Sequence, residues 1–408
     1  MFVGSAALGS VRTRLNVVHL DHTTARGGAE MALVRLLRAD RPWNAVVLHP
    51  AAEDEDVFAH LPEDVPRHIS GVRQEAGAST SSRIGALRIG AQLLKQAALT
   101  KAHPAVRRSD LVVANSTRAA AYGAIALRGS SKPFVVHLRD IVSVESLGRF
   151  GHRMMTQVIL PRADGVVANS NATLASAEPF LGPHAVRAVV PSASGLRVSG
   201  RRRTRPAGPL RFGILARIDP WKGQLMLLDA FAQAFPSGEE HLDIAGGAPF
   251  RHDDHIDELR ARAVELGISD RVRLLGQVDD VQGVLDGWDV GIQASLRPEP
   301  MGQNVLQYLS SGLVTIVAGE GGPVEWVTDG VNGVVVPPRD VDALATALRT
   351  VAADPQLRRR LSAEASLTPG LLDDDKVARL HAQVYEAVAR GTGLQHDRVR
   401  EPAQDLLA

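Results

Sequence analysis

Short runs of β-branched and aliphatic residues alternate with segments of helical spacing along most of the 408 residues, in two successive series. Strands that are apolar along their whole length are typical of parallel sheets covered by helices on both faces. The alternation therefore predicts an α/β fold with two doubly wound domains, which suits a chain of this length. The expected strands are 15–20, 45–48, 111–114, 134–138, 165–168 and 188–190, then 210–215, 241–245, 272–274, 290–292, 315–317 and 333–336.

A break in composition separates the two series. Between 199 and 209 the apolar pattern stops, and arginine, glycine and proline predominate, which favours a linker. Terminal segments without apolar periodicity are expected to be flexible. We therefore predict a flexible extension at 1–14, a first domain at 15–199, a linker at 200–209, a second domain at 210–372, a helix at 373–390 that crosses back to the first domain, and a flexible tail at 391–408.

Composition narrows the classes of function. Hydrophobic residues make up 45% and charged residues 22%, which favours a globular protein over a disordered one. A net charge of +1 provides no overall attraction for nucleic acid, so no such partner is expected. The absence of cysteine excludes disulfides, thiolate metal sites and a cysteine nucleophile. No stretch approaches the roughly 20 apolar residues of a membrane span, and the start lacks a secretory signal. We expect a cytoplasmic protein, soluble or attached to the cytoplasmic face of a membrane.

The loop after the first strand of the second domain carries two cations. Arg217 and Lys222 follow the strand that ends near Leu215, and Gly223 precedes a helix from about Gln224. Fixed positive charge beside a helix N-terminus, at the carboxyl end of a parallel strand, is suited to bind phosphate. Taken alone, the same residues could also form an ordinary solvated loop.

A second anion-binding feature is predicted at 297–307. Gly302 permits close backbone approach, and the helix that follows directs its free N–H groups at a bound phosphate. Glu299, at the loop tip, can accept hydrogen bonds from sugar hydroxyls. The residues expected to contact the substrate around this helix start are Met301, Gly302, Gln303, Asn304 and Val305.

Together these two segments resemble the C-terminal signature of family 4 glycosyltransferases, which have the GT-B fold. The signature is an arginine and a lysine-glycine after the first strand, then two glutamates around a glycine; here Arg217, Lys222-Gly223, Glu299 and Gly302 match it. The segments 311–317, 321–325 and 329–333 are similar to the family's continuation. The resemblance covers about 15–390 and is more specific after 209. It implies two Rossmann-like domains facing a central cleft, the first for the acceptor and the second for the donor.

The nucleoside part of the predicted site includes one departure from the family. Gln307 replaces the second glutamate, which the family associates with the ribose. An amide retains an acceptor oxygen, although a carboxylate is the stronger acceptor. We expect binding to survive, the alternative being weakened or redirected activity. For the base, the resemblance points to Gly246 and to the strand end at Gln277 and Val278.

The first domain contributes further candidates by resemblance. Gly27 and Gly28, after the first strand, stand where the family has a glycine-rich loop facing the diphosphate and the acceptor. His137, with Arg139 and Asp140, is similar to the histidine-bearing strand end that faces the donor sugar. A histidine on an apolar strand is equally consistent with a purely structural hydrogen bond.

By resemblance, the expected reaction is transfer of a sugar, with retained configuration, from a nucleoside diphosphate sugar to an acceptor hydroxyl. Arg217, Lys222 and the helix start at Gly302 would stabilise the leaving diphosphate, and Glu299 and His137 complete the catalytic set. No cofactor or metal is expected, because no Asp-x-Asp stands at a strand end and no histidine pair has ligand spacing. The acceptor could be a glycan, a lipid-linked sugar or a small molecule.

The sequence lacks the signatures of two other classes of function. A dehydrogenase would carry G-x-G-x-x-G after a strand, which the sequence lacks. A glycoside hydrolase would need two facing carboxylates, and the obvious pair is broken at Gln307. A sugar-nucleotide epimerase of the same architecture, and a non-catalytic nucleotide-sugar-binding protein, remain as alternatives.

The helical segment 83–101 has two interpretations. Ile84, Leu87, Ala91, Leu94 and Ala98 form an apolar seam, with Arg88, Lys95 and Lys101 beside or beyond it. Together with Arg107 and Arg108, these could form a basic surface for anionic lipid. An ordinary amphipathic helix with a solvated basic face is the interpretation that we favour here.

Overall fold

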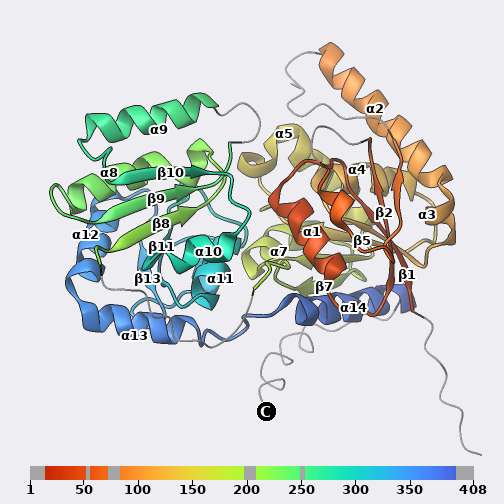
Figure 1. Ribbon diagram of the computed structural model, residues 1–408. Helices are drawn as coiled ribbons and strands as arrows, with labels where there is room; N and C mark the ends of the chain where they lie inside the picture. The colour runs from red at the N-terminus through yellow and green to blue at the C-terminus, as the bar shows by residue number, and fades with distance from the viewer. Residues whose placement is uncertain (1–13, 52–55, 72–82, 197–207, 249–252, 392–408) are drawn as a thin grey trace, which may run out of the picture.

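The computed structural model describes residues 14–51, 56–71, 83–196, 208–248 and 253–391. Within these ranges the chain forms two lobes, each built around a parallel sheet (Figure 1). The predicted extension at 1–14, the linker and the tail lie wholly or mostly outside the described residues. Among the described helices, none combines the length and the apolar character that a bilayer span requires.

The first lobe has a seven-stranded parallel sheet in the order β3-β2-β1-β4-β5-β6-β7. Its strands are β1 Asn16–Leu20, β2 Asn44–His49, β3 Arg67–Ile69, β4 Leu111–Ala114, β5 Phe134–Leu138, β6 Gly165–Ala168 and β7 Val186–Val189. Its helices are α1 Gly28–Arg38, α2 Arg83–Ala102, α3 Pro104–Arg108, α4 Thr117–Ala126, α5 Val144–Met154, α6 Leu160–Arg162 and α7 Asn171–Ala177.

The second lobe has a six-stranded parallel sheet in the order β10-β9-β8-β11-β12-β13. Its strands are β8 Arg211–Leu215, β9 His241–Ala245, β10 Val272–Gly276, β11 Val290–Gln293, β12 Val314–Ala318 and β13 Val334–Val336. Its helices are α8 Gln224–Ala234, α9 Asp253–Glu265, α10 Val281–Asp286, α11 Gln303–Ser310, α12 Val341–Ala353 and α13 Pro355–Ala365, and the last helix of the chain is α14 Asp374–Arg390.

The central strands of each sheet are buried on both faces, as their continuous apolar sequences predict. In β1, Val17 joins the core under α1 and α14, while its neighbour Val18 joins the core under α2 and α4. All four residues of β4 and of β6 are buried. Because successive side chains of a strand point to opposite faces, a fully buried strand requires a layer of helices on each side.

The strand order reverses at one point in each sheet, between β1 and β4 in the first and between β8 and β11 in the second. At such a switch point the connections leave in opposite directions, which opens a crevice at the carboxyl ends of the two central strands. Residues that follow β1, β4, β8 and β11 are therefore the ones that the fold presents to a ligand.

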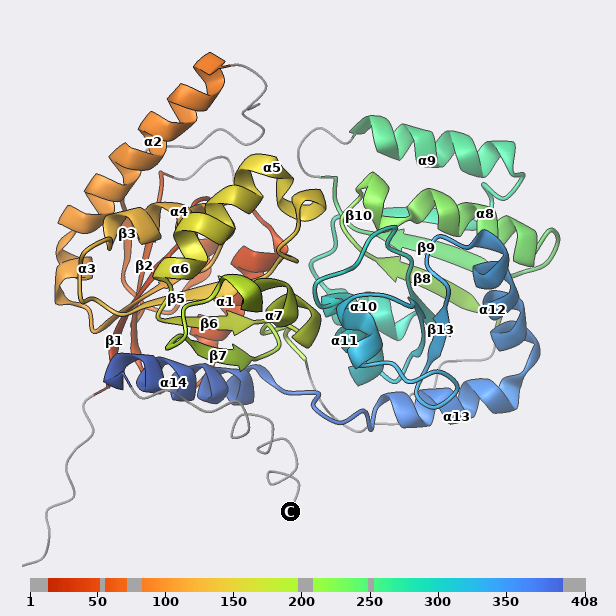
Figure 2. The same cartoon turned by 180° about the vertical axis from the view of Figure 1, so that it is seen from behind.

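The helix α14 follows the second lobe in sequence but lies along the first (Figures 1 and 2). Val377, Val384, Tyr385 and Val388 are at most 5% exposed and belong to the core beneath the first sheet. The chain thus crosses between the lobes a second time, and α14 packs against the first lobe.

Two elements differ from expectation. The short edge strand β3 was not predicted, because all three of its residues are exposed and it lacks an apolar run. In α2, the buried positions are Leu93, Gln96, Ala97 and Thr100, whereas Leu94 is 62% exposed. The described part of the predicted apolar seam therefore faces solvent, on the same side as the basic residues.

Candidate functional site

Lys222 and Glu299 meet at the carboxyl end of the second sheet. Lys222 Nζ lies 2.6 Å from Glu299 Oε2, and the side chains are only 16% and 13% exposed. Ser295 Oγ donates a second hydrogen bond to the same carboxylate oxygen, at 2.8 Å. Residues from the β8 and β11 loops, 77 positions apart in sequence, are thus held together at the switch point.

Trp221 organises the cations around this pair. The Lys222 ammonium lies 3.9 Å from the centroid of the Trp221 ring, and the Arg297 guanidinium lies 4.7 Å from it. Arg297 also donates a hydrogen bond to the Glu145 carbonyl oxygen of the first lobe, at 3.3 Å. Cation–π contact of this kind fixes positive charge without neutralising it. Trp221 was not among the predicted site residues, because its only signal in the sequence is its place beside Lys222.

Glycines allow the loops to come this close. Gly223 has φ 75°, and a Cβ there would lie 1.9 Å from the Ala294 carbonyl oxygen. Across the site, Gly321 has φ 74°, and its added Cβ would lie 2.4 Å from the Glu299 carbonyl oxygen. A side chain at either position would push the Lys222 or the Glu299 loop away from its place.

Arg217 is the more open of the two predicted cations. Its side chain is 44% exposed and forms an ion pair with Asp219 at 3.2 Å. Asp219 also caps the 3₁₀ turn Pro220–Lys222 by accepting a hydrogen bond from the Trp221 N–H. The guanidinium therefore lies in the same loop as Lys222, with most of its donors left for a ligand.

The start of α11 has the form expected of an anion site. Gly302, the N-cap residue, adopts the left-handed conformation, with φ 78° and ψ 58°, and offers no side chain to cap the helix. Gln303 and Asn304, in the first turn, are partly exposed, whereas Met301 and Val305 are buried. Met301 and Val305 thus direct their side chains into the protein. Asn304 Oδ1 accepts a hydrogen bond from the Val305 N–H at 3.0 Å, and Asn304 Nδ2 donates one to the Tyr308 hydroxyl at 3.4 Å. Of the predicted side chains, Gln303 is therefore the one best placed for the ligand.

Gln307 lies against the connection between the lobes. Its side chain amide donates a hydrogen bond to the Ser194 carbonyl oxygen at 3.2 Å, and the residue is 9% exposed. Ser194 and Gly195 in turn donate backbone N–H groups to Asp374 at the start of α14. In this arrangement the Gln307 amide nitrogen is used for contact between the lobes, and the predicted ribose contact stays a prediction.

The residues predicted for the nucleobase do come together. Gly246, with φ 150°, approaches so closely that an added Cβ would lie 1.9 Å from the Ala216 carbonyl oxygen. Gly247 contacts Gln277, whose amide donates to the Val278 carbonyl oxygen at 3.4 Å. The ends of β8, β9 and β10 thus form one group of loops beside Arg217.

The catalytic prediction for His137 is not supported by its surroundings. Nε2 lies 2.9 Å from the Tyr385 hydroxyl, Nδ1 lies 3.4 Å from Arg139 Nη2, and the residue is 5% exposed. Its ring stacks on Tyr385 and meets His381 edge-on, both from α14. Burial lowers the pKa of His137 well below its usual value, with His381 and Arg139 adding to the effect. The physical reason is the strand alternation, which turns position 137 toward α14.

Arg139 and Asp140 have different surroundings. Arg139 is half-buried and donates to Asn115 Oδ1 at 2.6 Å and to Ser192 Oγ at 2.7 Å, so it joins the ends of β4, β5 and β7. Asp140 is exposed and accepts a hydrogen bond from Thr117 Oγ1 at 3.3 Å. The carboxylate of Asp140 is attracted electrostatically to the guanidinium of Arg217 in the second lobe.

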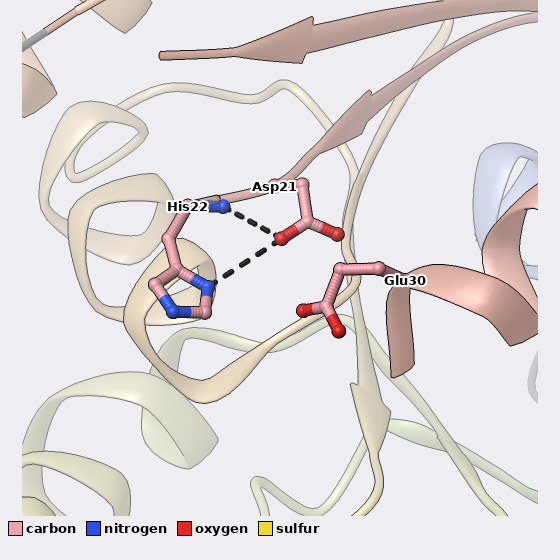
Figure 3. A group of neighbouring side chains, drawn as sticks. All are labelled: Asp21, His22 and Glu30. Atoms are coloured by element: carbon pink, nitrogen blue, oxygen red, sulfur yellow. Dashed lines mark hydrogen bonds and ion pairs between the residues drawn. The ribbon is translucent and has the colours of Figure 1, made fainter. Parts of the chain in front are cut away.

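Three potential metal ligands lie together after β1, namely Asp21, His22 and Glu30, with one ligand atom of each within 4.8 Å of the others (Figure 3). Asp21 accepts hydrogen bonds from the His22 backbone N–H at 2.7 Å and from Asn115 Nδ2 at 2.6 Å. His22 Nδ1 lies 2.8 Å from Ser116 Oγ. Two of the three ligands are thus satisfied by protein partners, and the group carries no metal assignment.

The two lobes contact each other directly around the site. Arg26 of the first lobe forms an ion pair with Asp279 of the second at 2.6 Å. Glu325 of the second lobe accepts hydrogen bonds from the backbone N–H groups of Asn171 and Ala172, at 2.9 and 2.8 Å. These N–H groups begin α7, where a carboxylate is favoured by the helix dipole.

The second lobe matches a known family. Residues 201–368 match the model of the family described as glycosyl transferases group 1. The second lobe is a group 1 glycosyltransferase domain. Within this glycosyltransferase domain lie Arg217, Lys222, Glu299 and the start of α11.

Relatives of known name resemble parts of the chain. The lipopolysaccharide core biosynthesis glycosyltransferase LpsE of Rhizobium meliloti (strain 1021) is 35% identical over 106 residues, or 26% of this chain and 31% of that protein. The lipopolysaccharide core biosynthesis mannosyltransferase LpcC of Rhizobium leguminosarum bv. viciae is 26% identical over 50% of this chain and 59% of that protein. The chain thus spans 31% and 59% of the length of these two curated relatives.

Solved structures resemble both lobes together. Anabaena Alr3699/HepE in complex with UDP is 25% identical, with a TM-score of 0.74 over 91% of this chain and 100% of that one. Sucrose-phosphate synthase from Thermosynechococcus elongatus has a TM-score of 0.75 over 92% of this chain and 99% of that one, at 20% identity. The GT-B architecture predicted for the glycosyltransferase domain and its partner lobe is confirmed.

Proposed function

We propose that the protein transfers a sugar from a nucleoside diphosphate sugar to an acceptor hydroxyl, with the second lobe holding the donor. The observation that carries the proposal is the junction of Lys222 and Glu299 beside the uncapped start of α11. This junction offers a cation and free helix N–H groups for a diphosphate, and a carboxylate for sugar hydroxyls. The family of the second lobe supports it, as does HepE, which was solved with UDP and with UDP-glucose.

In the proposed reaction the bond between the anomeric carbon and the phosphate oxygen breaks, and a bond to the acceptor oxygen forms. Negative charge grows on the leaving diphosphate, where Lys222, Arg217 and the α11 N-terminus stabilise it. The acceptor proton passes to an oxygen of the departing diphosphate, on the same face of the sugar. The configuration is then retained without a covalent enzyme intermediate, and neither a metal nor a cofactor takes part.

The direct test is a thermal-shift panel of uridine, guanosine, adenosine and thymidine diphosphate sugars. A true donor at 100 times its Kd stabilises the protein by about 2.7 kcal/mol. The donor found in this way is then incubated with glycan, lipid-linked and small-molecule acceptors, and the products are analysed by mass spectrometry. A glycosylated acceptor supports the proposal; an epimerised donor with no transfer would make the protein an epimerase, and binding without any product would make it a nucleotide-sugar-binding protein.

We also propose that α2 holds the protein against an anionic membrane surface on the cytoplasmic side. Arg88, Lys95 and Lys101 are exposed, and Leu94 lies on the same side of the helix with 62% of its surface exposed. An apolar side chain amid basic ones suits the boundary between lipid headgroups and acyl chains. Such a surface would bring a lipid-linked acceptor to the first lobe.

Vesicle sedimentation tests this surface. The wild type is expected to sediment with vesicles that contain phosphatidylserine, and binding should fall as salt rises. The variant Lys95→Glu should lose most of this binding, while Arg260→Glu, a change of the same charge on α9 of the second lobe, should retain it. Equal binding by both variants would contradict the assignment to α2.

A further inference from the structure

The carboxylate of Glu325 is bonded to the other lobe through both of its oxygens. Glu325 ends the 3₁₀ turn Gly322–Glu325 of the second lobe. Its Oε2 accepts hydrogen bonds from the backbone N–H and the side-chain amide of Asn171, at 2.9 and 2.8 Å, and its Oε1 accepts one from the Ala172 N–H at 2.8 Å. All three donors belong to the first turn of α7, on the side of the first lobe that faces the second (Figures 1 and 2).

Glu325 completes the cap of a helix that lies in the other lobe. The first turn of an α-helix has N–H groups that find no partner within the helix. In α7 the N-cap residue Ser170 accepts a hydrogen bond from the Thr173 N–H at 3.0 Å. The N–H groups of Asn171 and Ala172 are bonded to Glu325 instead. Separation of the lobes would expose these two N–H groups and the carboxylate to water, so the bonds exist only while the lobes are together.

The segment that carries Glu325 is joined to the loop before α11. The Gly322 N–H donates a hydrogen bond to the Glu299 carbonyl oxygen at 2.8 Å. The two segments are closely packed, because a Cβ added to Gly322 would lie 2.5 Å from the Pro300 carbonyl oxygen. The same carbonyl oxygen accepts a hydrogen bond from Thr173 Oγ1 at 3.2 Å. The first turn of α7 therefore contacts both Glu325 and the loop that is proposed to hold the donor.

We propose that Glu325 is a positioning residue that closes the second lobe onto α7 and so fixes the Glu299 loop against the first lobe. A carboxylate is a stronger acceptor than a neutral group, and the helix dipole favours its charge at a helix N-terminus. Because Glu325 is exposed, water competes for these bonds, so the lobes can still separate. The effect on donor binding rests on the proposed function, whereas the contact between the lobes does not.

Kinetics test the effect on donor binding. Glu325→Ala removes all three bonds, so a larger fraction of the protein has separated lobes that the donor must close. The KM for the donor should rise at least ~10-fold while kcat stays within about twofold of the wild type. Glu325→Gln keeps one acceptor oxygen and should give an intermediate KM. Glu364→Ala, at an exposed position of α13, should match the wild type. A lower kcat with unchanged KM would contradict the positioning role, because that result indicates only a smaller folded fraction.

A distance measurement between spin labels tests the contact between the lobes without any substrate. The chain contains no cysteine, so His184→Cys in the first lobe and Arg359→Cys in the second, both at exposed positions, provide one pair of labels. Double electron–electron resonance should show a shift to longer distances when Glu325→Ala is added to this pair. An unchanged distance distribution would overturn the inference, even if the wild type proves to be an active transferase. A protein that shows the expected shift but transfers no sugar would instead refute only the proposed function.

Discussion

At the scale of single residues, the site depends on close approach between loops that are far apart in sequence. Lys222 is held between Glu299 and the Trp221 ring. These two contacts depend on Gly223, because only a residue without a side chain lets the loop approach Ala294 so closely. The position of the Lys222 charge therefore depends on the backbone conformation at Gly223. One substitution at each residue tests this dependence.

Replacement of Lys222 by Ala should lower turnover by ~10²-fold or more, because a charge that stabilises the leaving group is lost. The measurement is kcat with the donor identified by thermal shift. Lys376→Ala, at an exposed position of α14, is the control and should leave kcat unchanged. Turnover of Lys222→Ala equal to that of the wild type would remove this ammonium from the mechanism.

Replacement of Gly223 by Ala should lower the free energy of unfolding by roughly 1–3 kcal/mol, because a side chain is strained at φ 75° and would collide with the Ala294 carbonyl group. Urea denaturation measures the loss. The matched control is Gly182→Ala, where an added Cβ meets no atom within 4 Å. If both variants unfold at the same urea concentration, the close approach does not constrain this loop.

At the scale of elements, α14 completes a lobe to which it does not belong in sequence. Its apolar face supplies Val377, Val384 and Val388 to the core below the first sheet. Added bulk at Gly165 of β6 would lie 2.5 Å from Val388, so the helix and the sheet are closely packed. Stability of the first lobe therefore depends on the last residues that the structure describes.

Val384→Ala should reduce the free energy of unfolding by ~1–3 kcal/mol, which reflects lost apolar burial and the cavity left behind. Far-UV circular dichroism during urea denaturation gives this quantity. Val331→Ala changes the same side chain where it is 49% exposed, so it should have little effect. A loss no larger than the control's would mean that α14 adds no stability to the first lobe.

At the scale of the whole molecule, three buried histidines join the beginning, the middle and the end of the chain. His19, His137 and His381 come from β1, β5 and α14, and all contact Tyr385. Burial lowers the pKa of His19 to about 3 and that of His381 to about 4. These rings must stay uncharged for the lobe and its returning helix to remain together.

Stability should therefore fall as the pH falls below about 6.5, the ordinary pKa of histidine. In this range the unfolded chain binds protons that the folded protein excludes, so acid favours unfolding down to the folded pKa values near 4 and 3. Urea denaturation at pH 7, 6 and 5 measures the trend. His381→Gln should make it shallower, whereas His184→Gln, at an exposed position, should not.

Much of the fold and the donor half of the site could be predicted from local sequence. Continuous apolar runs predict buried parallel strands, and eleven of the twelve expected strand positions lie within one residue of an observed strand at their first residue. The remaining one, expected at 188–190, begins two residues earlier at Val186. Lys222, Glu299 and Gly302 were predicted because cations, a glycine and a helix start are adjacent in the sequence at strand ends.

The direction of individual side chains was decided only by tertiary structure. His137 stands near the end of β5, where a site residue would be expected, but its partners Tyr385 and His381 lie some 250 positions away. The same holds for α2, whose apolar seam at Leu94 faces solvent. Periodicity tells which residues share a face of a strand or helix, whereas the element that covers that face is chosen by packing across the whole chain.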